Sequence, residues 1–177
     1  MLSDFQHLLK NWKLVSLVGA VVVSMLTYFA VLKNPMDAST ALAKGYYQHA
    51  FTLLLPEAEA GDPVAQNQLG ILYYLGMGVE QNQQLASQWF LKSALQKNAN
   101  AQINMGRQYQ NGLGVGIDTM RAYAWYRQAR NNKNENAELH MKLITGRAFL
   151  SPSQTQRANE IYNSAEDLKP SKEKGGF

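Results

Sequence analysis

Apolar side chains recur at helical spacing along the middle of the chain. The first stretch places four of them at i, i+4, i+7 and i+8, on one face of a helix: Ala65, Leu69, Leu72 and Tyr73. Gly76 and Gly78 then interrupt the pattern, as residues that end a helix do. A second apolar face follows with similar spacing: Ala86, Trp89, Phe90 and Ala94. The two faces predict a helical hairpin, in which the first helix packs against the second.

The hairpin pattern repeats with a period of 36 residues. Residues 65–79 align with residues 101–115, and the same register relates Trp89 to Trp125 and reaches a further small residue at Ala137. A lone hairpin could not bury its bulky aromatic side chains, so successive hairpins are expected to stack on one another. A fixed period of this length predicts an all-α solenoid built of helix pairs.

The aligned positions also resemble a known family. Glycine, small and apolar residues of the first copy are similar to the pattern of the Sel1-like repeat, a relative of the tetratricopeptide repeat: Gly61, Asp62, Ala65, Leu69, Gly70, Leu72, Tyr73, Gly76, Gly78, Val79, Ala86 and Trp89. The second copy resembles the same pattern, with Met105 and Gln108 where the first copy has leucine. The resemblance covers about residues 45–150. It implies an α/α solenoid of Sel1-like helical hairpins that serves as an interaction scaffold, and it implies no reaction.

The whole sequence divides into four parts, in order: an N-terminal tail and transmembrane helix (residues 1–33), a linker (34–40), the solenoid with a C-terminal capping helix (41–168) and a mobile tail (169–177). The first solenoid helix is expected to run from about Ala41 to Glu59. Pro56 should end or kink that helix, because proline lacks the N–H that a helix interior uses.

The last solenoid helix is expected to begin at Pro152, with Ser151 as its N-cap. One apolar stripe follows along it: Ala158, Ile161, Tyr162 and Ala165. A stripe on one side only is typical of a capping helix, which shields the open end of a solenoid from water.

Residues 14–32 form an uncharged, apolar run of 19 residues. At ~1.5 Å per residue, such a helix spans close to the ~30 Å of a bilayer's hydrocarbon core, so the run predicts a single transmembrane helix surrounded by lipid. The alternative, a cleaved signal peptide, is disfavoured because its apolar region is typically ~7–15 residues long. Lys10 and Lys13 precede the run and favour an N-terminus inside the cell. The protein is then expected in the inner (cytoplasmic) membrane, with its repeats in the periplasm of a Gram-negative source.

Small residues recur four apart along one face of this predicted helix: Ser16, Ala20 and Ser24. Small residues at this spacing let a second helix approach closely in lipid, so the face is a candidate contact with a membrane protein. The alternative interpretation is that such residues are simply common in membrane helices.

Composition and motifs argue against chemistry. The chain has no cysteine, and 17 basic residues against 13 acidic ones give a net charge of +4, too small to suggest a nucleic-acid partner. The glycines of residues 112–116 lack the strand–loop–helix context of a phosphate loop. The histidines His7, His49 and His140 are scattered. No catalytic, cofactor-binding or metal-binding residue is therefore predicted, and the chain is not expected to be an enzyme.

A second stripe on the first helix of each unit is expected to point away from the hairpin partner and to line a concave groove. It consists of Asn67, Ile71 and Tyr74 in the first copy and Ile103, Arg107 and Gln110 in the second. Aromatic, aliphatic and arginine side chains together are typical of interface hot spots, so these six are the predicted partner-binding residues. The alternative is that they pack on neighbouring helices.

Charge is distributed unevenly along the solenoid. Residues 45–100 carry two lysines against four acidic residues, whereas residues 101–147 carry seven basic residues against three acidic ones. Such a difference more often reflects solvated helix faces than a binding site.

Together these features predict a membrane-tethered adaptor, an accessory or assembly subunit of a larger membrane complex. Its partners would be other protein subunits, including a membrane protein. The alternative function is a transient regulator of envelope stress, secretion, motility or cell-wall assembly, and an enzyme of unknown type is less favoured.

Overall fold

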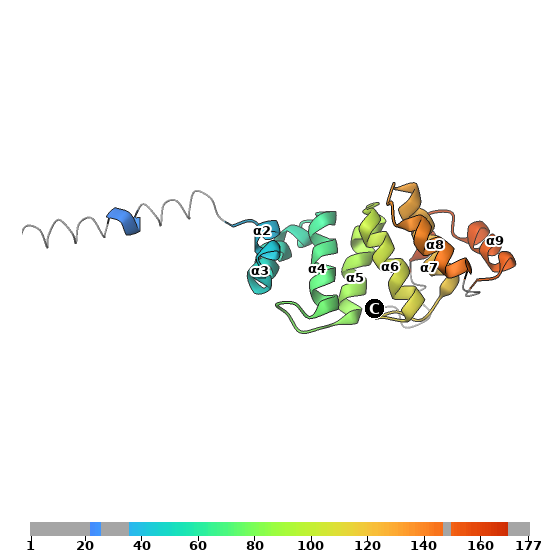
Figure 1. Cartoon of the computed structure of the whole chain (residues 1–177), viewed down its shortest axis with the longest axis horizontal. Helices are drawn as coiled ribbons and strands as arrows, with labels where there is room; N and C mark the ends of the chain where they lie inside the picture. The colour runs from blue at the N-terminus through green and yellow to red at the C-terminus, as the bar shows by residue number, and fades with distance from the viewer. Residues whose placement is uncertain (1–21, 26–35, 147–149, 170–177) are drawn as a thin grey trace, which may run out of the picture.

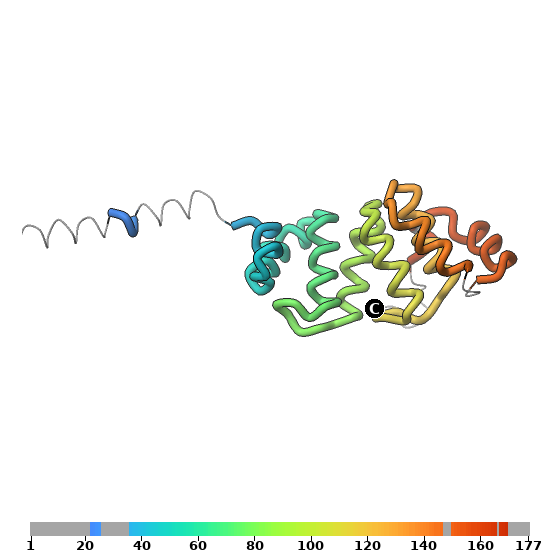
Figure 2. Tube along the Cα trace, viewed as in Figure 1, coloured from blue at the N-terminus to red at the C-terminus, as the bar shows by residue number. Residues whose placement is uncertain are grey.

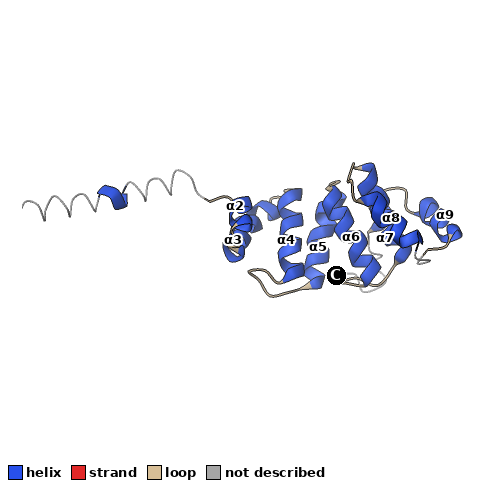
Figure 3. Cartoon of the chain, viewed as in Figure 1, coloured by secondary structure: helices blue, strands red, loops and turns tan. Residues whose placement is uncertain are grey.

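The computed structural model of the chain describes residues 22–25, 36–146 and 150–169. Every regular element within these ranges is a helix (Figure 3). The elements follow one another along the long axis of the molecule (Figure 1): α2 (Ala38–Ala43), α3 (Tyr47–Glu59), α4 (Pro63–Leu75), α5 (Gln83–Leu95), α6 (Ala99–Asn111), α7 (Thr119–Asn131), α8 (Ala137–Gly146), α9 (Pro152–Ile161) and the short 3₁₀ helix η1 (Glu166–Leu168).

Consecutive helices pack side by side as stacked hairpins, and the chain path turns back and forth between them (Figure 2). We call α4, α6 and α8 the A helices, and α3, α5, α7 and α9 the B helices. From α3 to α7, each A helix packs between the B helices that precede and follow it. The prediction of an all-α solenoid of helical hairpins is confirmed.

Side-chain caps at equivalent positions start the helices of both repeats. The carboxylate of Asp62 accepts a hydrogen bond from the backbone N–H of Ala65 at 2.7 Å, and the Asn98 amide does the same for Ala101 at 3.0 Å. Such caps satisfy backbone donors that have no partner inside the helix. Asn82 and Asp118 cap α5 and α7 in the same way.

The loop inside each hairpin is fixed by a close backbone approach. Gly78 and Gly114 have φ angles of +70° and +71°. A Cβ atom on Gly78 would lie 2.5 Å from the backbone at Tyr47, where α3 begins, and a Cβ on Gly114 would lie 2.1 Å from the carbonyl oxygen of Gln83, where α5 begins. Only glycine allows both the positive φ and the close backbone approach. Each loop therefore packs against the start of the preceding B helix, which fixes the stacking register.

Buried apolar side chains form two clusters. The smaller lies at the N-terminal end and comprises Ala41, Ala50, Leu54, Ala58, Ala65, Leu69 and Leu72. The larger runs from α5 to η1, and its largest members are Phe90, Trp125 and Tyr126. The predicted core stripe of Ala65, Leu69 and Leu72 is thus confirmed.

The predicted first helix from Ala41 to Glu59 is wrong. Two helices, α2 and α3, occupy this stretch, because Gly45 adopts a φ of +77° and the Tyr46 N–H turns back to the Ala41 carbonyl at 2.9 Å. Pro56 lies inside α3 and does not end it. It stands in the last turn, and the helix continues for three residues beyond it to Glu59. Residues 38–40, expected in the linker, form the start of α2.

The C-terminal predictions are largely confirmed. Ser151 caps α9, which starts at Pro152, and its side chain forms a reciprocal capping box with Gln154. Ala158 and Tyr162 are buried, but Ile161 is 45% exposed. The prediction of a buried stripe is therefore wrong at Ile161, and Ala165 lies beyond the end of the helix, partly buried against the larger cluster.

No helix within residues 22–25, 36–146 and 150–169 is long and apolar enough to cross a membrane. The transmembrane helix predicted over residues 14–32 lies outside the described residues except for residues 22–25, which are helical and exposed. Ser16 and Ala20 likewise lie outside them, and Ser24 belongs to the short helical segment.

Candidate protein-interaction surface

Two of the six predicted groove residues are not available on the surface. Asn67 is 7% exposed and Ile103 is 6% exposed, so the expectation that they line an open groove is wrong. The Asn67 Oδ1 atom accepts a hydrogen bond from Asn104 Nδ2 of the next A helix at 2.9 Å. Ile103 belongs to the larger core cluster together with Met141 and Ile144 of α8. Both residues therefore lie in the contacts between successive A helices, which we call the seams.

The other four predicted residues remain accessible. Ile71 and Tyr74 are partly exposed at the edge of the larger core cluster, and Arg107 is exposed. Gln110 is partly exposed, and its Oε1 atom accepts a hydrogen bond from the Tyr126 hydroxyl at 2.6 Å. An aliphatic, an aromatic and a cationic side chain on adjacent A helices can contact a peptide or a protein surface.

His140 joins this surface, although the sequence presented it as an isolated histidine. Its Nε2 atom lies 3.4 Å from Nη2 of Arg107, and its ring stacks on Tyr126 with centroids 4.9 Å apart. Burial and the nearby Arg107 guanidinium both lower the pKa of His140, because each disfavours the charged imidazolium. Burial raises the pKa of Tyr126. The repeat register was the signal, since His140 stands 36 residues after Asn104.

Arg107 has no carboxylate within ion-pair distance among the residues that the structure describes. Its contact with the neutral form of His140 leaves the guanidinium charge uncompensated there. An exposed arginine held in this way can pair with a carboxylate of a partner.

A repeated amide bridge joins successive helices of the solenoid. Gln66 Nε2 donates to the Ala58 carbonyl at 3.0 Å, and Gln66 Oε1 accepts from Gln96 Nε2 at 2.8 Å. Gln102 makes the equivalent two bonds one repeat later, at 3.0 and 2.9 Å. Each amide links an A helix to the B helices before and after it, so the hairpins are joined by polar bonds as well as by apolar packing.

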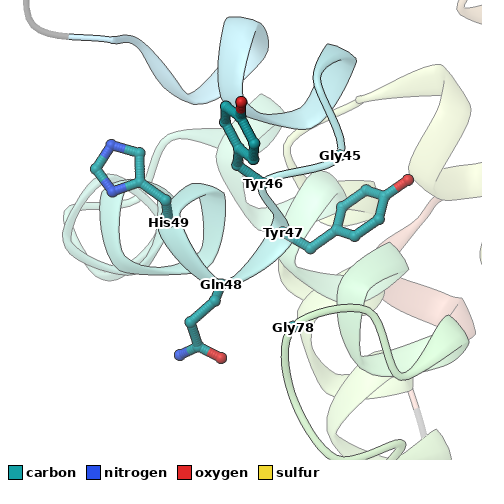
Figure 4. A pocket seen from close by; sticks show the side chains of 6 residues that line it. All are labelled: Gly45, Tyr46, Tyr47, Gln48, His49 and Gly78. Atoms are coloured by element: carbon teal, nitrogen blue, oxygen red, sulfur yellow. The ribbon is translucent and has the colours of Figure 1, made fainter.

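A shallow pocket of about 480 Å³ lies at the start of α3 (Figure 4). It is lined by Gly45, Tyr46, Tyr47, Gln48, His49 and Gly78. The His49 ring points away from the Gly78 loop. Among the described residues no group of three His, Cys, Asp or Glu could hold a metal ion.

Comparison with known proteins identifies the repeats. Residues 63–98 and 99–134 each match the model of the Sel1 repeat. Comparison with curated proteins gives no match. A solved Sel1 repeat protein from Oxalobacter formigenes is similar with a TM-score of 0.59 and 36% identity, over 63% of this chain and 46% of that protein.

A second similar structure is c5321, a protective antigen present in uropathogenic Escherichia coli strains and displaying an SLR fold. Its TM-score is 0.65 at 26% identity, over 75% of this chain and 30% of that protein. The chain thus corresponds to less than half the length of either structure. Residues 63–134 thus carry two Sel1 repeats, and such repeats indicate a protein–protein interaction module.

Proposed function

We propose that this Sel1-like repeat protein is a membrane-tethered adaptor, an accessory or assembly subunit of a larger membrane complex. It binds other protein subunits, including a membrane protein, and it binds no nucleic acid and catalyses no reaction. The observation that carries the proposal is the accessible set Ile71, Tyr74 and Arg107 on interlocked A helices.

The geometry of these three residues suits protein recognition. Ile71 and Tyr74 pack partly against the core, so they lose little conformational freedom when a partner covers them. Arg107 adds a charge without a carboxylate partner among the described residues, which selects an acidic group on the partner. Gln110, the fourth predicted residue that stays accessible, lies on the same helix as Arg107.

The membrane part of the proposal rests on the apolar run of residues 14–32, with lipid around it and its N-terminus inside the cell. The repeats then lie in the periplasm. Protease added to spheroplasts with an intact inner membrane should degrade the repeats and leave the short N-terminus protected. Protection of residues beyond Asp37 from the protease would contradict this orientation and place the repeats in the cytoplasm.

Affinity purification of the full chain from native membranes in a mild detergent tests the adaptor role. The unmodified chain should bring down the same subunits in fixed stoichiometry. Loss of the partner on washing would indicate weak, transient binding and would favour the alternative function, a transient regulator. Turnover of a substrate by the purified chain would contradict the non-catalytic assignment.

The groove is tested by Tyr74→Ala combined with Arg107→Ala, which should retain helicity and weaken copurification. A matched control is Tyr46→Ala with Arg157→Ala, since both residues are exposed away from the groove. If the variant of Tyr74 and Arg107 retains the complex in full, these residues are not the partner-binding site. The face of Ser16, Ala20 and Ser24 would then be the first candidate for the contact with the partner.

A further inference from the structure

The last A helix, α8, leaves uncovered a position that is buried in the helices before it. Asn67, Ile103 and Leu139 stand 36 residues apart. They are 7%, 6% and 56% exposed respectively. The register of α8 is secure, because Ala137 and Ile144 are fully buried at positions equivalent to the core of α4 and α6. Leu139 thus occupies the position that is buried in α4 and α6, but no helix among the described residues covers it.

One turn further along the same face, α8 exposes a second leucine. Leu143 is 39% exposed and follows Leu139 at i+4, so the two side chains lie next to each other. Its equivalent in α6 is Arg107, whose guanidinium contacts His140 of the following A helix. On α8 this second position is also left without a following helix among the described residues.

The two rows of helices end differently. In the B row, α9 packs on α7 and places Ala158 in the larger core cluster. In the A row, side chains of each later segment reach the helix before it, as Asn104 reaches Asn67 and Asn134 reaches Asn100, both at 2.9 Å. Among the residues that the structure describes, nothing makes the corresponding contact with Leu139 and Leu143. The B row is capped, and the A row is open.

We propose that the Leu139–Leu143 face of α8 is a docking site for an acidic amphipathic helix of a partner protein, which adds to the A row as its next helix. The inference rests on the proposed adaptor function and gives it a second contact surface. The new helix would continue an interface that the chain already forms between α4 and α6 and between α6 and α8.

Charge around this face selects an acidic partner. Arg130 and Lys142 share the single carboxylate of Glu138, at 3.6 and 3.9 Å. Arg107, on the adjacent A helix, has no carboxylate among the described residues. Acidic side chains flanking the apolar stripe of the incoming helix would balance these cations.

A second copy of the chain fits this face less well than a different protein does. An added helix that continues the row makes a head-to-tail contact, and the second copy would present its own open α8. Such a contact does not close and would propagate into filaments. A partner helix ends the row in a single step.

The test measures binding of three synthetic, helix-constrained peptides to the full chain in mild detergent by fluorescence anisotropy. The first peptide has leucines at i, i+4 and i+7 with flanking glutamates, the second has lysines in place of the glutamates, and the third has the first composition in scrambled order. The acidic peptide should bind at least ~10-fold more tightly than the other two. Added salt should weaken its binding, because the flanking charges are exposed.

Leu139→Glu with Leu143→Glu should reduce binding of the acidic peptide at least ~10-fold. Ile161→Glu is the control, since Ile161 is 45% exposed on α9, away from the open row. Circular dichroism should show unchanged helicity in both variants. Equal affinity for the double variant, or equal binding of the scrambled peptide, would overturn the proposal.

Two further measurements test whether a second copy of the chain or the chain's own C-terminus occupies the Leu139–Leu143 face instead. Sedimentation velocity that shows self-association lost in the double variant would assign the face to a second copy. A peptide that binds only after removal of residues 170–177 would assign it to the chain's own C-terminus. Native copurification distinguishes failure of this site from failure of the adaptor function. A complex that tolerates the Leu139/Leu143 variant but not the variant of Tyr74 and Arg107 would support the adaptor function and exclude the α8 site.

Discussion

The two repeats carry a tryptophan at the same position, but the side chains have different environments. Trp125 of α7 is 0% exposed within the larger core cluster. Trp89 of α5 is only partly buried, and the Lys92 ammonium lies 3.9 Å from its ring centroid. The larger cluster also contains Ala158 of α9 and Leu168 of η1, whereas the smaller cluster, against which Trp89 packs, contains no residue of these elements. Two residues at equivalent repeat positions can thus differ in burial, because the helices that follow each repeat differ. We therefore expect them to contribute differently to the free energy of unfolding.

Removal of the two indole rings should give the largest difference between the repeats. Trp125→Ala is expected to cost ~3–5 kcal/mol of unfolding free energy, since it leaves a cavity in a closed core. Trp89→Ala should cost clearly less, because solvent already reaches part of its ring. Urea unfolding of the full chain in mild detergent measures both, and equal costs would mean that the difference in burial between the two tryptophans does not affect stability.

The glycine loops should show the next effect, and here the repeats should agree. Gly112→Ala should cost ~1–2 kcal/mol, because alanine is strained at a φ of +70° and its Cβ would meet the Ile117 side chain, at 2.8 Å, and not backbone. Gly114→Ala should cost an additional ~1–3 kcal/mol, because its Cβ would also overlap the Gln83 carbonyl oxygen at 2.1 Å. Gly76→Ala and Gly78→Ala provide the same pair in the first repeat. Equal costs within either pair would argue against seating of the loop on the preceding B helix.

The amide bridges provide a finer comparison. Gln102 is 0% exposed and Gln66 is 5% exposed, and both donate to a carbonyl at the end of a B helix. Replacement of Gln102 by leucine should cost ~0.5–1.5 kcal/mol, because it removes two side-chain hydrogen bonds while the Ala94 carbonyl still accepts from the Lys97 N–H. The cost at Gln66 should be equal or smaller. A gain in stability for Gln102→Leu would show that the bridge does not stabilise the stack.

The smallest effect is a pH dependence confined to the second repeat and α8. The folded state lowers the pKa of His140, so the unfolded chain binds this proton more readily. Stability should therefore be complete above the unfolded pKa of about 6.5 and should fall as the pH drops below it, levelling off below the folded pKa. His140→Gln should remove this decline, whereas His49→Gln should not. Thermal unfolding between about pH 5 and 8 gives the readout.

The sequence by itself determined the repeat and most helix limits. Its period of 36 residues placed the A and B helices, since caps such as Asp62 and left-handed glycines such as Gly76 act locally. It also predicted the start of α9 from Ser151 and Pro152. It failed between Ala41 and Glu59, where Gly45 divides the stretch into two helices.

Burial was decided by the tertiary structure. A helical stripe tells which residues share a face, but it does not tell whether a later helix covers that face. This is why Asn67 and Ile103 are sealed in the seams although the stripe suggested a groove, and why Leu139 at the same register is open. His140 met Arg107 only through stacking of α8 on α6. Local chemistry defined the repeating unit, whereas the number of stacked units and the way each row ends determined which surfaces remain for a partner.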